Sequence, residues 1–107
     1  MPQYAVIQSL PPEDCPLTNK AVREFGKKVL TNAPAVAKEL NLNVLSYLHL
    51  DPTHKAFMLM EAPNAEGARD YLVRAGFMHF TEMEFHLVTP IEELMQRVDE
   101  IPTLYTS

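Results

Sequence analysis

Hydrophobic and polar residues alternate in four short stretches of the chain, a pattern typical of β-strands whose two faces meet different surroundings. These stretches span residues 4–10, 44–50, 55–62 and 77–90. The last one reads FMHFTEMEFHLVTP, and its polar positions include His79, Glu82, Glu84 and His86. Between the second and third stretches, Asp51-Pro52-Thr53-His54 predicts a turn with His54 exposed, so this pair forms a hairpin.

Apolar residues at helical spacing follow the first strand and predict a helix that begins after Pro16. Thr18 is the predicted N-cap of this helix. Pro34 lies inside the pattern, and the residue before a proline avoids helical angles. We therefore expect a break near residues 32–33, followed by a short second piece over residues 35–40.

Two more helices are predicted after the hairpin. One has Asn64 as its N-cap and ends before Gly76, which suits a left-handed C-cap. The other starts at Thr89-Pro90-Ile91-Glu92, where Thr89 and Glu92 form a capping box and Pro90 takes the first helical position. The apolar positions of this last helix are Ile91, Leu94, Met95 and Val98.

The predicted order is β-α-β-β-α-β with an extra C-terminal helix, an α+β chain of the ferredoxin-like type with an antiparallel sheet. The length of 107 residues, without a linker that would divide it, predicts a single domain over residues 1–107. In this plan both crossover helices cover one face of the sheet. The other face, called here the open face, must meet solvent, the terminal helix or a second subunit.

Composition and charge exclude several classes of function. The formal net charge is −5 and basic residues are not clustered, which argues against binding to nucleic acid. No apolar stretch approaches the roughly 20 residues of a membrane helix. The single cysteine, Cys15, cannot form an internal disulfide, so a cytoplasmic location is expected.

Counting by twos along each strand assigns side chains to the two faces. The more compact or apolar alternate set of each strand is assigned to the helices. The set predicted on the open face is Tyr4, Val6, Gln8, Tyr47, His49, Phe57, Leu59, Glu61, Phe80, Glu82, Glu84 and His86. A mixed apolar and polar face of this size is typical of an interface, so we expect a homodimer that pairs the open faces around a polar cavity.

The segment between Leu45 and Pro90 contains the phrases HLDPTHKAFMLMEAP, AEGARDYLVRAGF and EFHLVTP. With the order of elements, it resembles the dimeric α/β-barrel superfamily, and within it the small single-domain members that are uncharacterised or bind metal. The resemblance implies a homodimer, and it implies functions as different as cofactor-independent mono-oxygenation, isomerisation, haem handling and nickel binding. A shared fold does not choose among them.

The first hypothesis is a site for a divalent metal such as zinc or nickel. One imidazole with carboxylates suits these ions, and the candidate ligands are His49, Glu82, Glu84 and His86. The strands that carry His49 and His86 occupy opposite edges of a ferredoxin-like sheet. The site therefore requires His49 of one subunit to approach His86 of another.

Two other hypotheses use the same residues differently. In an enzyme of the mono-oxygenase or isomerase type, a His/Glu pair would transfer a proton while Gln8, Tyr47 and Glu61 bind a small, largely apolar ligand. In a structural or interaction domain, the same polar residues are simply solvated or hydrogen-bonded.

Overall fold

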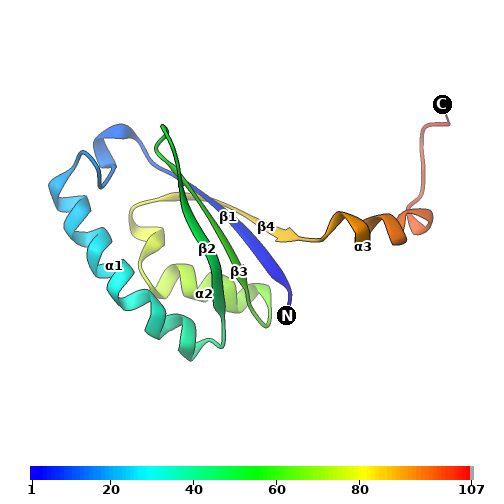
Figure 1. Cartoon of the computed structure of the whole chain (residues 1–107), viewed down its shortest axis with the longest axis horizontal. Helices are drawn as coiled ribbons and strands as arrows, with labels where there is room; N and C mark the ends of the chain where they lie inside the picture. Colours follow the sequence, from blue (N-terminus) through cyan, green and yellow to red (C-terminus); the bar gives the residue numbers. More distant parts are fainter. Residues whose placement is uncertain (107) are drawn as a thin grey trace.

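A four-stranded antiparallel sheet with two helices on one face forms the body of the protein in the computed structural model, which describes residues 1–106 (Figure 1). The strands are β1 (Gln3–Ser9), β2 (Asn43–Leu50), β3 (Lys55–Glu61) and β4 (Glu82–Val88), in the spatial order β2-β3-β1-β4. The helices are α1 (Lys20–Glu39), α2 (Ala65–Arg74) and α3 (Ile91–Gln96). Short 3-10 turns span Pro12–Asp14, Phe77–His79 and Val98–Glu100. The α+β, ferredoxin-like architecture agrees with the prediction from sequence.

The hydrophobic core lies between the sheet and the two helices. Met58 and Met60 of β3 and Val6 of β1 are completely buried there. Tyr71 and Leu72 of α2 pack over them in the same cluster. These strand residues occupy alternate positions, so the side of the sheet that carries them, called here the covered face, is the one that α1 and α2 protect from water.

Helix α1 differs from the prediction at its start and in its middle. Its N-cap is Asn19, whose side-chain oxygen accepts a hydrogen bond from the backbone N–H of Val22 at 3.1 Å, whereas the Thr18 hydroxyl donates to the Cys15 carbonyl at 3.2 Å. The helix also continues through Pro34 without a break. Ala33 and Ala37, on either side of the proline, are buried against the core, so packing holds the helix in place despite the hydrogen bond that proline cannot make.

Helix α2 begins and ends as its sequence predicts. The Asn64 side chain accepts a hydrogen bond from the N–H of Gly67 at 2.8 Å. Gly76 follows the helix with φ of 103°, in the left-handed region. A Cβ atom at Gly76 would lie 3.0 Å from Cγ2 of Val29 in α1, so both the backbone angle and the close approach of α1 favour glycine here.

The stretch 77–90 is a strand only from Glu82 onward. Residues Phe77–His79 form a 3-10 turn, because Gly76, with its left-handed backbone, changes the direction of the chain after α2 and before β4 begins. Phe77 is buried, and the Phe80 ring meets the Phe25 ring of α1 edge-on at 5.6 Å between centroids. The placement of Phe80 on the open face was therefore wrong.

The C-terminal residues 89–106, called here the arm, extend away from the sheet (Figure 1). Thr89 does not cap α3; the N-cap position is Pro90, which makes no side-chain hydrogen bond, and no residue of α3 is buried. The radius of gyration is 16.8 Å, compared with about 13 Å for a compact domain of roughly 100 residues. Within residues 1–106, no helix combines the length and apolar character needed to cross a bilayer.

Candidate functional site

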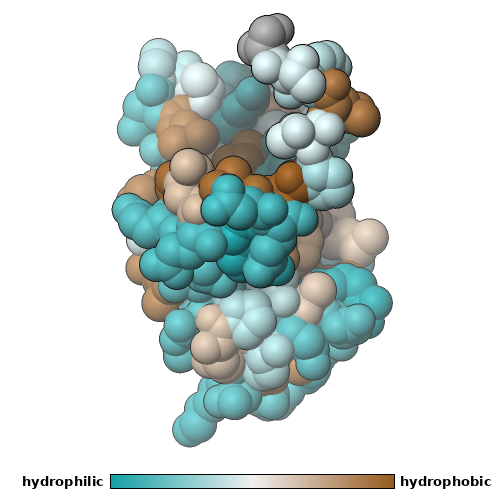
Figure 2. Space-filling view, turned by 90° about the vertical axis from the view of Figure 1, so that its right-hand side faces the viewer, coloured by the Kyte–Doolittle hydropathy of each residue, from teal (hydrophilic) through white to brown (hydrophobic). Residues whose placement is uncertain are grey.

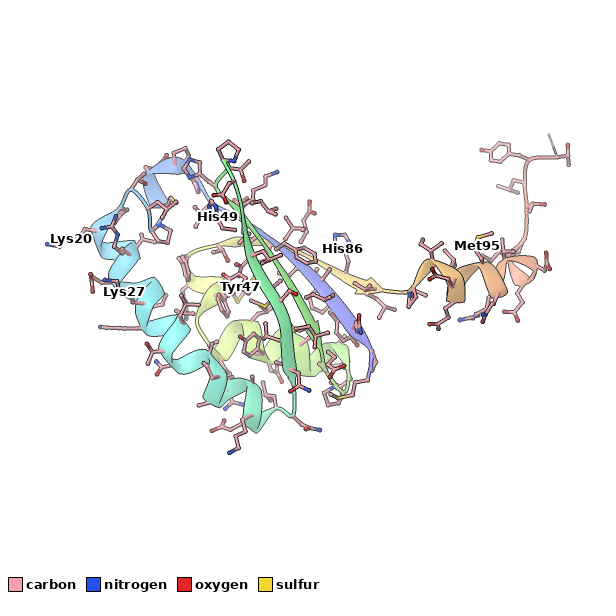
Figure 3. All side chains as sticks on the ribbon, viewed as in Figure 1. Lys20, Lys27, Tyr47, His49, His86 and Met95 are labelled. Carbon is pink, nitrogen blue, oxygen red and sulfur yellow. The ribbon has the colours of Figure 1, made fainter. Side chains whose placement is uncertain are left out.

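The predicted site residues separate onto the two faces of the sheet. Glu61, Glu82, Glu84 and His86 lie on the open face, as expected from their register with Gln3, Ser9, Ile7 and Ala5 of β1. His86 points away from the helices (Figure 3). Its Nε2 atom lies 3.6 Å from Oε2 of Glu84, and both side chains are largely exposed.

His49 lies on the covered face, not on the open face. The register between β2 and β3 pairs Val44 with Met60 and Ser46 with Leu59, so Leu45 is an extra residue in β2. A bulge of this kind moves every later side chain of the strand to the opposite face. The expectation that His49 of one subunit meets His86 of another across the open face was therefore wrong.

The four predicted metal ligands consequently do not gather in one chain. Within residues 1–106, no group of three or more His, Cys, Asp or Glu side chains is arranged to hold a metal ion. Glu84 and His86 remain neighbours on the open face. Binding of a divalent metal and homodimerisation through the open face stay predictions.

Gln8 and Tyr47 also lie on the covered face, and the structure brings them together. Gln8 is only 2% exposed, and its Oε1 atom accepts a hydrogen bond from the Tyr47 hydroxyl at 2.5 Å. The Tyr47 ring meets the buried Phe77 ring edge-on at 5.7 Å. Two effects explain why counting by twos misplaced the pair. One is the bulge in β2, and the other is that the helices cover the bulkier alternate set of β1, Tyr4, Val6 and Gln8, which had been assigned to the open face.

Burial raises the pKa of the Tyr47 hydroxyl to about 12, with a smaller contribution from the nearby Tyr71 hydroxyl and an opposing effect of the hydrogen bond to Gln8. Burial likewise raises the pKa of Tyr71. Tyr47 therefore stays protonated at neutral pH and donates its hydrogen bond. This donation occupies the oxygen of the Gln8 amide and leaves the amide nitrogen to find another partner.

A cavity of about 170 Å³ lies beside this pair, where the sheet meets the loop before α1. Its lining includes Gln8, Cys15, Tyr47, His49, His54 and Phe80. Within residues 1–106, two buried side-chain atoms lack a hydrogen-bond partner, Nε2 of Gln8 and Nδ1 of His54, and both belong to residues of this lining. The cavity is called here the Gln8 cavity.

His54 and the loop around Cys15 were missed as site residues. His54 was expected to be exposed in the turn, but it is half-buried because its carbonyl accepts a hydrogen bond from the N–H of Leu10 at 3.2 Å, which ties the turn to the end of β1. The pairing of β1 with β3 brings the two segments together. The position of His54 directly before a predicted strand was the only local signal for this contact.

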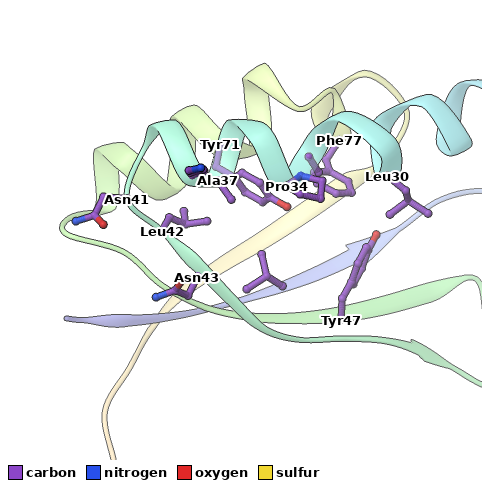
Figure 4. Close-up of a pocket in the computed structure, with 12 residues that line it drawn as sticks. Leu30, Pro34, Ala37, Asn41, Leu42, Asn43, Tyr47, Tyr71 and Phe77 are labelled. Atoms are coloured by element: carbon purple, nitrogen blue, oxygen red, sulfur yellow. The ribbon is translucent and has the colours of Figure 1, made fainter.

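A second cavity, of about 520 Å³, continues along α1 toward the start of β2 (Figure 4). Tyr47 contributes to the lining of both cavities. In Figure 4 Tyr47 rises from β2 toward α1, while Leu30 and Pro34 of α1 and Tyr71 of α2 lie on the opposite wall. Glu61 takes no part in either lining; its carboxylate accepts a hydrogen bond from the Asn43 side chain at 3.0 Å.

The Gln8 cavity combines hydrogen-bond donors with an oriented histidine. A glutamine amide nitrogen can only donate, so the buried Nε2 atom requires an acceptor. At the rim, Nδ1 of His49 lies 2.7 Å from Oδ1 of Asp51. A histidine held by a carboxylate in this way is arranged as general bases commonly are. The lining therefore offers buried donors for an oxygen acceptor, with the exposed pair of His49 and Asp51 beside them.

Comparisons with known proteins support the fold and no particular chemistry. No family model and no curated protein matches the chain. A REP-associated tyrosine transposase bound to a REP hairpin is similar with a TM-score of 0.52 and 7% identity, over 92% of this chain and 62% of the transposase chain. This chain thus spans less than two thirds of the transposase, and the likeness concerns the fold alone.

A second structure, of a candidate antibiotic biosynthesis monooxygenase from Deinococcus radiodurans, is similar with a TM-score of 0.46 and 12% identity, over 84% of this chain and 94% of that one. This overlap is too loose to carry an argument about function.

Proposed function

We propose that this protein binds a small organic molecule in the Gln8 cavity, through a carbonyl or carboxylate oxygen of the ligand. The observation that carries the proposal is the buried Gln8 amide, whose oxygen is occupied by Tyr47 and whose nitrogen has no partner within residues 1–106. Leaving such a donor unpaired costs about 1–3 kcal/mol. A ligand that supplies an acceptor recovers part of this free energy on binding.

The size and lining of the cavity narrow the class of ligand. An apolar cavity of roughly 150 Å³ is known to admit benzene, so about 170 Å³ suits a molecule with a single ring. Leu10, Pro16, Ala56 and Phe80 supply apolar walls for that ring. An aromatic ketone or acid therefore fits the cavity better than a sugar, a nucleotide or a peptide.

His54 is a second donor for the same oxygen. Its Nδ1 atom is buried and unpaired within residues 1–106, and the neutral ring donates from this atom in one of its two tautomers. A donor from β1 and a second donor from the turn before β3 would bind one acceptor more specifically than either alone. This arrangement corresponds to the pattern of most ligand sites, an apolar pocket with a few placed polar groups.

The test compares two probes of nearly equal shape, acetophenone and ethylbenzene, by ligand-observed NMR titration of the full chain. We expect acetophenone to bind about tenfold more tightly, which is the effect of one hydrogen bond to a buried donor. The variant Gln8→Leu removes the donor and keeps the size of the side chain. In this variant the preference for acetophenone should disappear while ethylbenzene binds as before.

Gln3→Leu is the matched control, because Gln3 lies on the same strand with its side chain on the open face. It should leave both affinities unchanged. Equal affinity of the unmodified protein for the two probes, or no binding of either, would show that the Gln8 amide does not recognise a ligand.

A further inference from the structure

The arm carries an uncovered apolar face. The hydrophobic residues Ile91, Leu94, Met95, Val98 and Ile101 are all exposed in this structure. The first four repeat at the spacing of one side of a helix. Figure 2 views the molecule from the side on which the arm projects, and there hydrophobic residues lie at the surface next to a cluster of hydrophilic ones. A helix with such a face normally packs it against another surface.

The arm is also acidic, whereas α1 is basic. Residues 89–106 contain four acidic side chains and one basic side chain, a formal charge of −3. Residues 20–39 contain five basic and two acidic side chains, a formal charge of +3. Lys20 and Lys27 both project from the end of α1 that lies farthest from the arm (Figure 3).

A groove beside this basic half of α1 matches the arm in both respects. It has a volume of about 340 Å³ and lies between α1, the loop before it and the end of the 3-10 turn after α2. Leu17, Leu30 and Phe80 supply apolar walls. Arg23 and Lys27 stand at its α1 side, and the Arg23 guanidinium is held there by hydrogen bonds to the carbonyls of Pro16 and Leu17. An acidic amphipathic helix is suited to a groove of this kind.

The open face of the sheet is a poorer match for the arm. It also has an apolar centre, formed by Ile7, Phe57 and Leu59, which are partly exposed. However, Glu82 and Glu84 of the neighbouring β4 lie on the same face. Carboxylates on both surfaces repel each other, so charge favours the groove beside α1 over the open face.

The arm of a chain extends away from the groove of the same chain (Figure 1). The arm leaves the sheet at Val88, on the outer strand and at the end of the sheet where β1 begins. The groove includes Phe80, beyond the opposite end of β4, and Tyr47 on β2, the strand at the opposite edge. A second copy can bring its arm to this groove without the arm folding back over its own sheet.

We propose that the arm of one copy of this protein lies in the α1 groove of a second copy, with its apolar side in the groove. Its acidic side then faces Lys27 at the groove and Lys20, which lies on the same side of α1 about two turns earlier. The exchange is reciprocal, so that two copies are related by a two-fold axis and each contributes one arm and one groove. Such an interface closes on itself and does not extend into a filament. It does not depend on the ligand proposed for the Gln8 cavity.

Charge reversal tests this exchange on the full chain at low salt, where exposed charges are least screened. The groove variant carries Lys20→Glu and Lys27→Glu, and the arm variant carries Glu92→Lys and Glu93→Lys. Each variant alone places like charges together in both contacts, so light scattering should show half the mass of the unmodified assembly. An equimolar mixture of the two variants restores opposite charges in both contacts and should restore the mass as a mixed complex, identified by native mass spectrometry.

The control variant Lys28→Glu with Lys55→Glu changes the same amount of charge outside the groove and should keep the unmodified mass. Leu94→Asp, which leaves the groove intact, should halve it. Circular dichroism verifies that every variant is folded. The proposal is overturned if the unmodified protein is a single chain, if the charge variants keep its mass, or if the mixture forms no mixed complex. Arms packed on their own chains and association through the open face alone both give such results.

Discussion

Helices α1 and α2 cover the same face of one sheet, but they fill the space above it differently. The buried residues of α2 include the large side chains of Tyr71 and Leu72. Those of α1 are small, namely Gly26, Val29, Ala33 and Ala37. Small side chains bring the helix close at a few points and leave the space between those points unfilled, which is where the cavities of about 520 and 340 Å³ occur.

A cavity of about 430 Å³ also borders α2, but it lies on the outer side of that helix, against β4. It does not include Gln8 or Tyr47. Helix α2 thus supplies the large helical side chains of the packed core. The space left beside α1 lies next to Tyr47, the partner of the buried Gln8.

Truncation of one leucine on each helix should give the largest contrast. Leu72→Ala removes a buried side chain from the core and should lower the free energy of unfolding by about 2–5 kcal/mol. Leu30→Ala removes a side chain that is 56% exposed, so it should cost less than about 1 kcal/mol. Urea denaturation of both variants measures the difference, and equal losses would show that the two helices are packed equally well.

Enlargement of one alanine on each helix should give effects of opposite sign. Ala68 of α2 is completely buried, so Ala68→Leu should overpack the core and destabilise the protein by about 1–3 kcal/mol. Ala33 of α1 borders the cavity of about 520 Å³. Ala33→Leu should fill part of that cavity and leave stability unchanged or raise it by up to about 1 kcal/mol. A clear loss of stability in Ala33→Leu would indicate that this cavity closes in solution.

Ionisation of Tyr47 should give the smallest effect, at high pH. Because the folded state raises its pKa from 10.0 to about 12, the unfolded chain loses the proton first as the pH rises. The stabilisation is thus complete below about pH 10 and is lost between about pH 10 and pH 12. Full burial would make two pH units worth roughly 2.7 kcal/mol. Since Tyr47 is 38% exposed, screening by water should reduce this to about 1 kcal/mol.

The measurement compares the pH dependence of unfolding in the unmodified protein and in Tyr47→Phe, because the other tyrosines and the lysines titrate in both. Ultraviolet absorbance of the phenolate follows the tyrosine itself. Parallel stability curves for the two proteins above pH 10 would mean that the Tyr47 hydroxyl is not held against Gln8 as the structure places it.

The elements whose signals are local were predictable from sequence. Asn64 and Gly76 define the ends of α2 through a side-chain cap and a left-handed backbone angle, and both depend only on residues within one or two turns. The row Glu82, Glu84 and His86 was also placed correctly, because β4 runs without a bulge in its pairing with β1.

The candidate site was not predictable in the same way. One extra residue, Leu45, moves Tyr47 and His49 to the covered face, and the sequence around it contains no glycine or proline that would announce a bulge. Gln8 was assigned to the open face together with Tyr4 and Val6, and all three are buried on the covered face. The hydrogen bond from the Tyr47 hydroxyl, 39 positions away in the chain, offsets part of the free energy that burial of the Gln8 amide costs.

Local chemistry and the alternation of apolar residues thus determine which segments are strands and helices, their order, and the ferredoxin-like plan. The tertiary structure decides which polar side chains meet. A pairing register is a property of two strands together, and a one-residue slip in it reverses a whole face at little local cost. For this reason Tyr47 and His49 lie on the covered face, opposite to the exposed row of Glu82, Glu84 and His86, and Tyr47 meets the buried Gln8 there.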